Sequence, residues 1–211
     1  MILTIAFLSS VLMCANVFAA VTGSCGNSIK WTLDDSGNLT LSGSGEMRDN
    51  GFGYNNLTFR YYGTKTVTIG DGITSIGDYA FYSCRGLTEL TLPNTLERIV
   101  ASAFRGCSGL TELTLPNSVW SIGEYAFQGC SGLTELTLPN SITSIGDYAF
   151  AYCSDLSKIT SLAEIPPVCG FKVFNGVNKT NCELIVPKGS VAAYTRAEDW
   201  NEFSNIRGFS E

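Results

Sequence analysis

A strict 23-residue repeat constrains this chain more than any other feature of its sequence. The first unit opens at Val67, and units of the same length open, without insertion or deletion, at Leu90, Leu113 and Leu136. Residues 113–135 read LTLPNSVWSIGEYAFQGCSGLTE, and residues 136–158 read LTLPNSITSIGDYAFAYCSDLSK. Self-similarity at a fixed period of this size is the signature of a solenoid, in which each repeat forms one coil.

Every unit carries the same apolar positions, and their spacing predicts its local structure. In the third unit these positions are Leu113, Leu115, Val119, Ile122, Ala126, Phe127, Cys130 and Leu133. The Leu-x-x-Leu-x-Leu pattern of residues 110–115 predicts a short strand, which Pro116 and Asn117 should end. Residues 121–123 predict a second extended segment, and residues 125–127 predict a helical or 3₁₀ turn.

Stacking of the units is a thermodynamic requirement. Burying the apolar side chains of one unit releases less free energy than ordering its backbone costs, so a lone unit is unstable. Neighbouring coils must cover its open faces and complete its strand hydrogen bonds. We therefore expect residues 67–158 to form a leucine-rich-repeat solenoid, mainly of β-strands with short helical or 3₁₀ turns. One buried row should contain Phe81, Phe104, Phe127 and Phe150.

The open ends of a solenoid need caps. For residues 20–66 we expect an N-terminal cap. Alternating polarity over residues 29–33 and 39–41, around turn-forming residues 34–38, predicts a β-hairpin there. An aromatic run should follow as irregular structure over the first coil: Phe52, Tyr54, Phe59, Tyr61 and Tyr62.

For residues 159–211 we expect a mixed C-terminal cap, because two consecutive prolines at 166–167 break the period. Residues 184–187 predict a last strand, and a short helix carrying Val191 and Tyr194 should follow. The residues expected to pack behind that helix are Trp200, Phe203 and Ile206.

Cysteine recurs at one position of the repeat, at Cys84, Cys107, Cys130 and Cys153. We expect a column of small buried thiols that pack as hydrophobic groups, because disulfides between coils would require a specific geometry. Even spacing without histidine or Cys-x-x-Cys pairs predicts no metal site. Cys169 and Cys182 lie close together in the C-terminal cap and could form a disulfide after export, an alternative that the sequence leaves open.

The beginning of the chain predicts export. Residues 1–19 have the mostly apolar stretch and the small residues before a cleavage position that a signal peptide needs, although no Lys or Arg precedes them. A buried element of the folded domain and a lipid-bearing Cys14 are the alternatives. No later stretch is long enough to span a bilayer, so we expect a secreted or cell-surface protein without a transmembrane helix in its mature part.

Composition excludes several classes of function. The formal net charge is −6, and without clustered Lys and Arg the chain should not bind nucleic acid. The absence of histidine removes the Ser-His and Cys-His nucleophile pairs and most zinc sites. Columns in a solenoid also spread like residues along a face, away from any shared pocket. We therefore expect no catalytic residue, no cofactor and no metal.

Outward-facing positions are the candidates for binding a partner. On the main strand, residues between the inward leucines should point to solvent. They are Glu89, Thr91, Glu112, Thr114, Glu135, Thr137, Lys158 and Thr160. The acidic strip among them is either a solvated face, or a surface that meets a basic partner or weakly holds Ca²⁺. A secondary aromatic patch, which either packs between coils or forms an interface, consists of Tyr79, Trp120, Tyr125 and Tyr148.

These motifs carry a family resemblance. The unit with Leu-x-x-Leu-x-Leu-Pro, then Ser-Ile-Gly-x-x-Ala-Phe, then Cys-x-x-Leu resembles the BspA-like leucine-rich repeats of bacterial surfaces over residues 67–158. Cap motifs that begin at Trp31 and Val186 are similar to caps of this class. The resemblance implies a secreted or surface location and a role in adhesion or protein binding, without a catalytic motif. Residues 98–101 depart from the pattern because they lack the glycine of the other units.

We therefore expect a scaffold that binds a protein or another macromolecule, whose identity the sequence does not name. A structural role through self-association is the alternative. Enzymatic activity is disfavoured by the missing acid–base groups. Ice binding through the column of Thr91, Thr114 and Thr137 is disfavoured because glutamates interleave with it.

Overall fold

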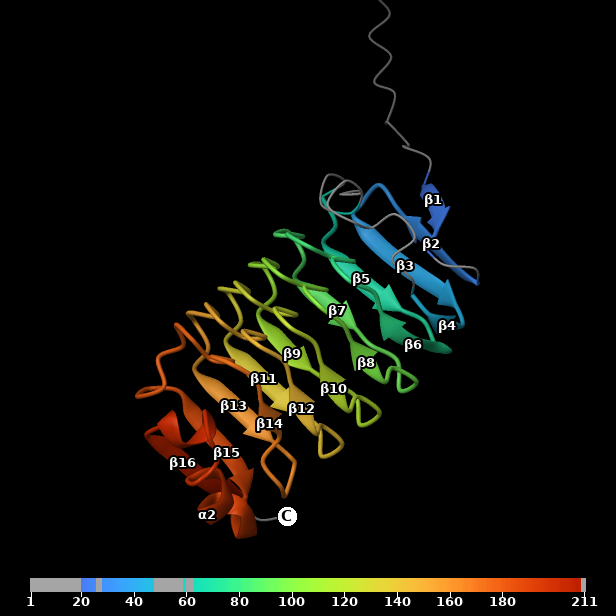
Figure 1. The fold of residues 1–211 in the computed structure, drawn as a ribbon. Helices are drawn as coiled ribbons and strands as arrows, with labels where there is room; N and C mark the ends of the chain where they lie inside the picture. The colour runs from blue at the N-terminus through green and yellow to red at the C-terminus, as the bar shows by residue number, and fades with distance from the viewer. Residues whose placement is uncertain (1–19, 26–27, 48–58, 60–62, 210–211) are drawn as a thin grey trace, which may run out of the picture.

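The computed structural model describes residues 20–25, 28–47, 59 and 63–209, and it shows a β-solenoid (Figure 1). The coils from β3 to β14 each place one strand on a front face and one strand in a back sheet. The predicted leucine-rich-repeat solenoid is confirmed. The signal peptide predicted at residues 1–19 lies outside the described residues, as do Phe52, Tyr54, Tyr61 and Tyr62.

The front face consists of two sheets, and the back sheet is continuous. The first front sheet has the order β1 (Val21–Ser24), β2 (Ile29–Leu33), β3 (Asn38–Gly43), β5 (Thr66–Ile69) and β7 (Glu89–Thr91). The second has the order β9 (Glu112–Thr114), β11 (Glu135–Leu138), β13 (Lys158–Ser161), β15 (Glu183–Pro187) and β16 (Asn205–Phe209). The back sheet has the order β4 (Gly45–Glu46), β6 (Ile73–Ile76), β8 (Arg98–Ile99), β10 (Ser121–Ile122), β12 (Ser144–Ile145) and β14 (Val168–Cys169).

Residues one repeat apart pair in parallel register, as a period of fixed length requires. Leu136 is opposite Leu113 on the front face, and Ile145 is opposite Ile122 in the back sheet. β8 keeps this register with both of its neighbours. The missing glycine at Val100 therefore leaves the pairing of the second coil unchanged.

The segment expected to be a helical or 3₁₀ turn is a run of turns, in which bonds to the residue three positions back alternate with bonds to the next coil. In the third coil, the N–H groups of Tyr125, Phe127 and Gly129 donate to carbonyls of the next coil, whereas those between them donate three residues back. A helix would keep all of these bonds inside one coil. The alternation needs left-handed backbone at Tyr125, with φ of 56°, and at Gly129, with φ of 71°. The hydrogen bonds of these turns therefore join neighbouring coils along a third side of the solenoid, in addition to the front and back sheets.

The predicted phenylalanine row is confirmed and extends by one ring at each end. Ring centroids lie 4.9 Å apart between Phe81 and Phe104, 5.2 Å between Phe104 and Phe127, and 5.3 Å between Phe127 and Phe150. Phe59 and Phe174 continue the stack at 5.7 and 5.9 Å. All six rings are buried, so one hydrophobic interior runs through every coil.

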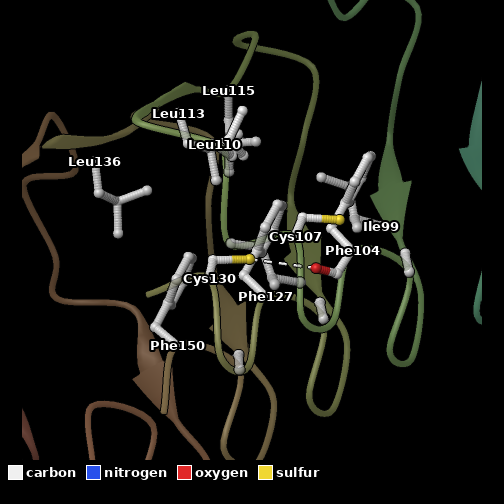
Figure 2. Close-up of a cluster of buried hydrophobic side chains, with 14 of the residues drawn as sticks. Ile99, Phe104, Cys107, Leu110, Leu113, Leu115, Phe127, Cys130, Leu136 and Phe150 are labelled. Atoms are coloured by element: carbon white, nitrogen blue, oxygen red, sulfur yellow. Dashed lines mark hydrogen bonds between the residues drawn. The ribbon is translucent and has the colours of Figure 1, made fainter. Parts of the chain in front are cut away.

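The predicted cysteine column is also confirmed, with an added polar function. Cys84, Cys107, Cys130 and Cys153 are all buried. Three of the thiols donate to the carbonyl oxygen of the phenylalanine in the preceding coil, as Figure 2 shows for Cys130 and Phe104 at 3.2 Å. Burial raises the pKa of the Cys130 thiol to about 12, so this group stays protonated and unreactive at neutral pH.

The N-terminal cap contains the predicted hairpin. β2 and β3 pair antiparallel, and β1 adds a third antiparallel strand. β3 then pairs in parallel with β5, which joins the hairpin directly to the first front sheet. Trp31 packs edge-on against Phe59 at 5.2 Å and covers that end of the phenylalanine stack.

The solenoid does not stop at residue 158. β13 and β14 continue the front and back sheets, and Phe174 takes the place of the coil phenylalanine. The prolines at 166–167 lie in the loop between β13 and β14, where they lengthen the coil without ending it. Part of the predicted C-terminal cap is therefore a fifth coil.

The remaining C-terminal residues close the interior as predicted. They form η1 (Lys188–Ser190), α2 (Val191–Tyr194), η2 (Trp200–Glu202) and β16. Trp200 and Phe203 are buried against Phe174, and the buried Tyr194 packs on Trp200. The Trp200 indole N–H donates to the Pro167 carbonyl at 2.9 Å, which satisfies one polar group at the closed end.

The disulfide suggested for Cys169 and Cys182 is not formed, and both are free cysteines. Cys169 lies in β14 of the back sheet, whereas Cys182 precedes β15 of the opposite front sheet. Closeness in sequence therefore does not bring the two thiols together, because the turn run from one sheet to the other separates them.

The front face is split between β7 and β9. These two strands share no ladder, although β6, β8 and β10 pair continuously behind them (Figure 1). Leu90 and Leu92 are only partly buried at the split, whereas Leu113 and Leu115 across it are buried. The core of the second coil is therefore more open toward the front.

We expect the substitution Gly129→Ala to lower the free energy of unfolding by about 1 kcal/mol. A Cβ at this position would meet nothing closer than 3.9 Å, so its cost comes from the left-handed φ of 71° alone. Thermal denaturation should show a fall of about 2–4 °C. Gln128→Ala, at an adjacent residue with ordinary φ, is the control, and equal effects of the two substitutions would contradict this explanation.

Candidate functional site

The front face carries all eight predicted partner-binding residues. Glu89 and Thr91 lie on β7, and the other six lie at matching positions of β9, β11 and β13. Most are exposed; the half-buried ones are Thr137, Lys158 and Thr160. Their backbones are fixed by strands whose inward side chains are buried, so the outward groups stand in register rows on a rigid support.

The predicted acidic strip is interrupted by ion pairs. Glu135 binds Lys158 at 3.0 Å, and the row continues through Glu183, which pairs with Arg207. Within the described part of the chain, no ion pair neutralises Glu89 or Glu112. These two carboxylates lie on either side of the split between β7 and β9, so the unpaired negative charge of the face is concentrated there.

Charge in this row also shifts acid–base equilibria. The Arg207 guanidinium donates to the Glu183 carboxylate and holds the pKa of that carboxyl below its ordinary value. Because the pKa of the Glu183 carboxyl is lower in the folded protein than in the unfolded chain, the ion pair stabilises the fold at pH values above the ordinary pKa of a glutamate. That contribution is lost as the pH falls through the lowered pKa.

Threonine forms a longer outward row than the sequence analysis found. The row comprises Thr22, Thr32, Thr40, Thr68 and Thr91 on the first front sheet, and Thr114, Thr137 and Thr160 on the second. The first three are outside the four strict repeats. The alternating polarity of the hairpin is the signal that could have placed Thr32 and Thr40 on this face.

The predicted aromatic patch is not one surface. Tyr125 and Tyr148 stack at 5.3 Å, which supports packing between adjacent coils. Tyr79 lies two coils from Tyr125, and Ser102 occupies the left-handed turn position between them. Trp120 projects next to the back sheet with 44% of its surface exposed.

Sequence reasoning missed a set of apolar side chains on the fifth coil. Leu162, Ile165, Val168 and Phe171 are exposed, Ile165 by 83% and Val168 by 72%. Beside them lies a groove of about 760 Å³, whose lining includes Asn117, Asn140, Thr143 and Phe209. The sequence could have indicated this set, because Leu162, Ile165 and Val168 lie around the two prolines that interrupt the repeat pattern.

Metal-binding clusters and reactive thiols were the remaining candidates for chemistry in the described residues. Within the described residues, no group of three or more His, Cys, Asp or Glu side chains is placed to hold a metal ion. Burial raises the pKa of Cys25 to about 11 and that of Cys182 to about 12, which keeps both thiols protonated. No helix in the described part of the chain is long and apolar enough to cross a bilayer.

Stacked coils with one leucine-bearing strand each define a leucine-rich-repeat protein, a class of solenoid that typically serves as a non-catalytic scaffold. The BspA-type leucine-rich repeat region matches residues 54–180 in six copies. The chain therefore belongs to the BspA-type leucine-rich-repeat family. The match starts before Val67 and ends after residue 158, in agreement with the additional coils of the structure.

Solved structures of bacterial leucine-rich-repeat proteins share the fold. A protein from Eubacterium ventriosum is 18% identical, with a TM-score of 0.54 over 92% of this chain and 73% of its own. The T. pallidum leucine-rich-repeat protein is 22% identical, with a TM-score of 0.56 over 80% of this chain and 87% of its own. The pneumococcal vaccine antigen PcpA is 19% identical with a TM-score of 0.55, and this chain, matched over 81%, spans 51% of it. Among curated proteins there is no match.

We expect Arg207→Met to raise the pKa of the Glu183 carboxyl, because it removes the donor that stabilises the carboxylate. Carbon-detected NMR titration of the glutamate side chains measures this pKa directly. Arg196→Met, on the exposed residue after α2, is the matched loss of one positive charge. An unchanged titration of Glu183 in the Arg207 variant would show that the ion pair is not formed in solution.

Proposed function

We propose that the chain is an exported, non-catalytic scaffold that binds protein at the bacterial surface through its front face. The observation that carries this proposal is the front face itself, on which rows of outward polar side chains stand in register over a continuous buried core. Such a face is preorganised, so little affinity is lost to ordering this chain when a partner binds.

The split between β7 and β9 is the centre of the proposed binding face. Glu89 and Glu112 project there without ion pairs among the described residues, and Leu90 and Leu92, which pack against the core beside Glu89, are only partly buried. Apolar surface surrounded by unpaired carboxylates suits a basic protein segment with an apolar side chain. Long-range attraction between the opposite charges would mainly raise the association rate.

The family and its structural neighbours support the surface role. BspA-type repeats form the matched region, and one neighbour is described as a pneumococcal vaccine antigen. The apolar beginning of the chain supports export. Adhesion follows as the specific role if the partner is a macromolecule on another cell.

Charge reversal on the front face should weaken binding if this proposal is correct. We expect the double variant Glu89→Lys/Glu112→Lys to bind a panel of surface-protein extracts at least about tenfold more weakly, measured by biolayer interferometry at low and high salt. Glu97→Lys/Glu124→Lys, which makes the same charge change away from β7 and β9, is the control. Equal binding by both double variants would exclude the front face as the site.

A further inference from the structure

The split between β7 and β9 leaves main-chain groups unpaired along both of its edges. At matching positions of other coils, the Thr134 N–H donates to the Thr111 carbonyl at 2.8 Å, and the Leu115 N–H donates to the Thr137 carbonyl at 3.3 Å. Among the described residues, no main-chain bond of either kind joins the second coil to the third on this face. Each edge therefore offers one donor and one acceptor: the Leu92 N–H and the Thr88 carbonyl on the β7 side, and the Thr111 N–H and the Thr114 carbonyl on the β9 side.

An unpaired hydroxyl lies at the end of the same interface. Thr95 donates to the Ile73 carbonyl at 3.0 Å, and Ser141 donates to the Val119 carbonyl at 2.6 Å, so each hydroxyl joins its coil to the preceding one. Ser118 occupies the matching position of the third coil, where its buried hydroxyl has no hydrogen-bond partner within the described part of the chain. The missing contact between the second and third coils therefore extends from the strands into the turn that follows them.

The second and third coils stay joined on their other two sides. In the back sheet, the Gly123 N–H donates to the Ile99 carbonyl at 2.7 Å, and β8 pairs with β10 (Figure 1). Along the turns, the N–H groups of Ser102 and Phe104 donate to carbonyls of the third coil, each at 2.8 Å. The front can therefore widen about these two sides without breaking a main-chain hydrogen bond, because none joins the two front strands.

A strand elsewhere on the front face shows what fits between two strands that carry glutamate. β13 lies between β11 and β15, with Lys158 opposite Glu135 on one side and Glu183 on the other. The Lys158 ammonium binds Glu135 at 3.0 Å, and the isoleucine that follows it in β13 is buried. In the split, Glu89 and Glu112 stand at the positions that would flank such a lysine.

An extended main chain satisfies both edges of the split at once. Each edge offers a donor and an acceptor spaced along a strand, which is the pattern that a parallel neighbour completes. The two carboxylates repel each other, and one positive charge placed between them replaces that repulsion with attraction. Apolar side chains of the same segment would cover Leu90 and Leu92, which are only partly buried.

We propose that the split between β7 and β9 is a strand-addition site, which binds an extended segment of a protein partner as a parallel strand of the front face. The segment carries a basic residue followed by an apolar one, as β13 does. Its main chain completes the hydrogen bonds that the two edges lack, and its basic side chain lies between Glu89 and Glu112. This inference rests on the proposed function of the front face and specifies how that face recognises its partner.

A synthetic peptide with the sequence of β13 and its flanks tests the site. Residues 156–162 read Leu-Ser-Lys-Ile-Thr-Ser-Leu, and calorimetric titration of the full chain with this peptide, capped at both ends, should give a Kd below about 1 mM. N-methylation of the peptide's lysine removes the N–H that would meet the Thr88 carbonyl, so affinity should fall at least about tenfold. N-methylation of the peptide's first leucine, which lies outside the split, is the control and should leave affinity unchanged.

Two further measurements locate the peptide. The variant Glu89→Lys/Glu112→Lys should prefer a peptide with glutamate in place of lysine at least about tenfold over the parent peptide, because the opposite charges are exchanged. Saturating parent peptide should slow hydrogen exchange of the Leu92 and Thr111 amides at least about tenfold, measured by NMR. The Ser157 amide, which already donates to the Thr134 carbonyl at 3.0 Å, should not change.

The outcomes separate this inference from the proposed function. No binding at about 1 mM, equal affinity of the parent and lysine-methylated peptides, or unchanged exchange of Leu92 and Thr111 overturns strand addition. None of these results depends on a surface-protein extract, because the titration uses the purified chain and a peptide alone. Equal binding of extracts by the two double charge variants would instead overturn the front face as the binding face.

Discussion

The distance between successive coils is the constraint on which the rest of this structure depends. Parallel strands lie about 4.8 Å apart, and the phenylalanine rings of neighbouring coils lie 4.9–5.9 Å apart, close to that spacing. Each coil must therefore fill the same thin slab with the same few side chains. The ring stack, the thiol-to-carbonyl bonds and the alternating turn bonds satisfy this requirement together, and loss of one coil would expose the faces of its two neighbours.

The same constraint divides the positions of each coil into inward ones that hold the structure and outward ones that are available for function. Inward positions tolerate few substitutions, because their side chains pack against the adjacent coils and their hydrogen bonds extend to them. Outward positions on the front face and in the back sheet are free to change, and there the coils differ most. Lys158 interrupts the glutamate row, Ser102 interrupts the tyrosine row, and Val168 ends a serine row. The binding site that we propose also lies at a departure from the repeat, the split between β7 and β9.

The features that repeat and the two caps could be predicted from the sequence, whereas most departures from the repeat could not. The coil length, the Phe127 row and the Cys130 column followed from the period alone. The fifth coil escaped prediction because its prolines lengthen the unit. The split of the front face leaves no local signal, since residues 89–92, 112–115 and 135–138 all read Glu-Leu-Thr-Leu. Ion pairs such as the one that Lys158 forms depend on side-chain conformation, which the repeat pattern does not specify.

Native-state hydrogen exchange, resolved coil by coil by mass spectrometry, tests most directly whether all coils share one interior. The turn amides of Phe104, Phe127 and Phe150 all donate across to the next coil. One shared core predicts that these amides exchange through the same global opening, with opening free energies equal to within about 1 kcal/mol. Exchange of the second coil through a separate opening of much lower free energy, with the third and fourth coils still protected, would contradict a continuous core.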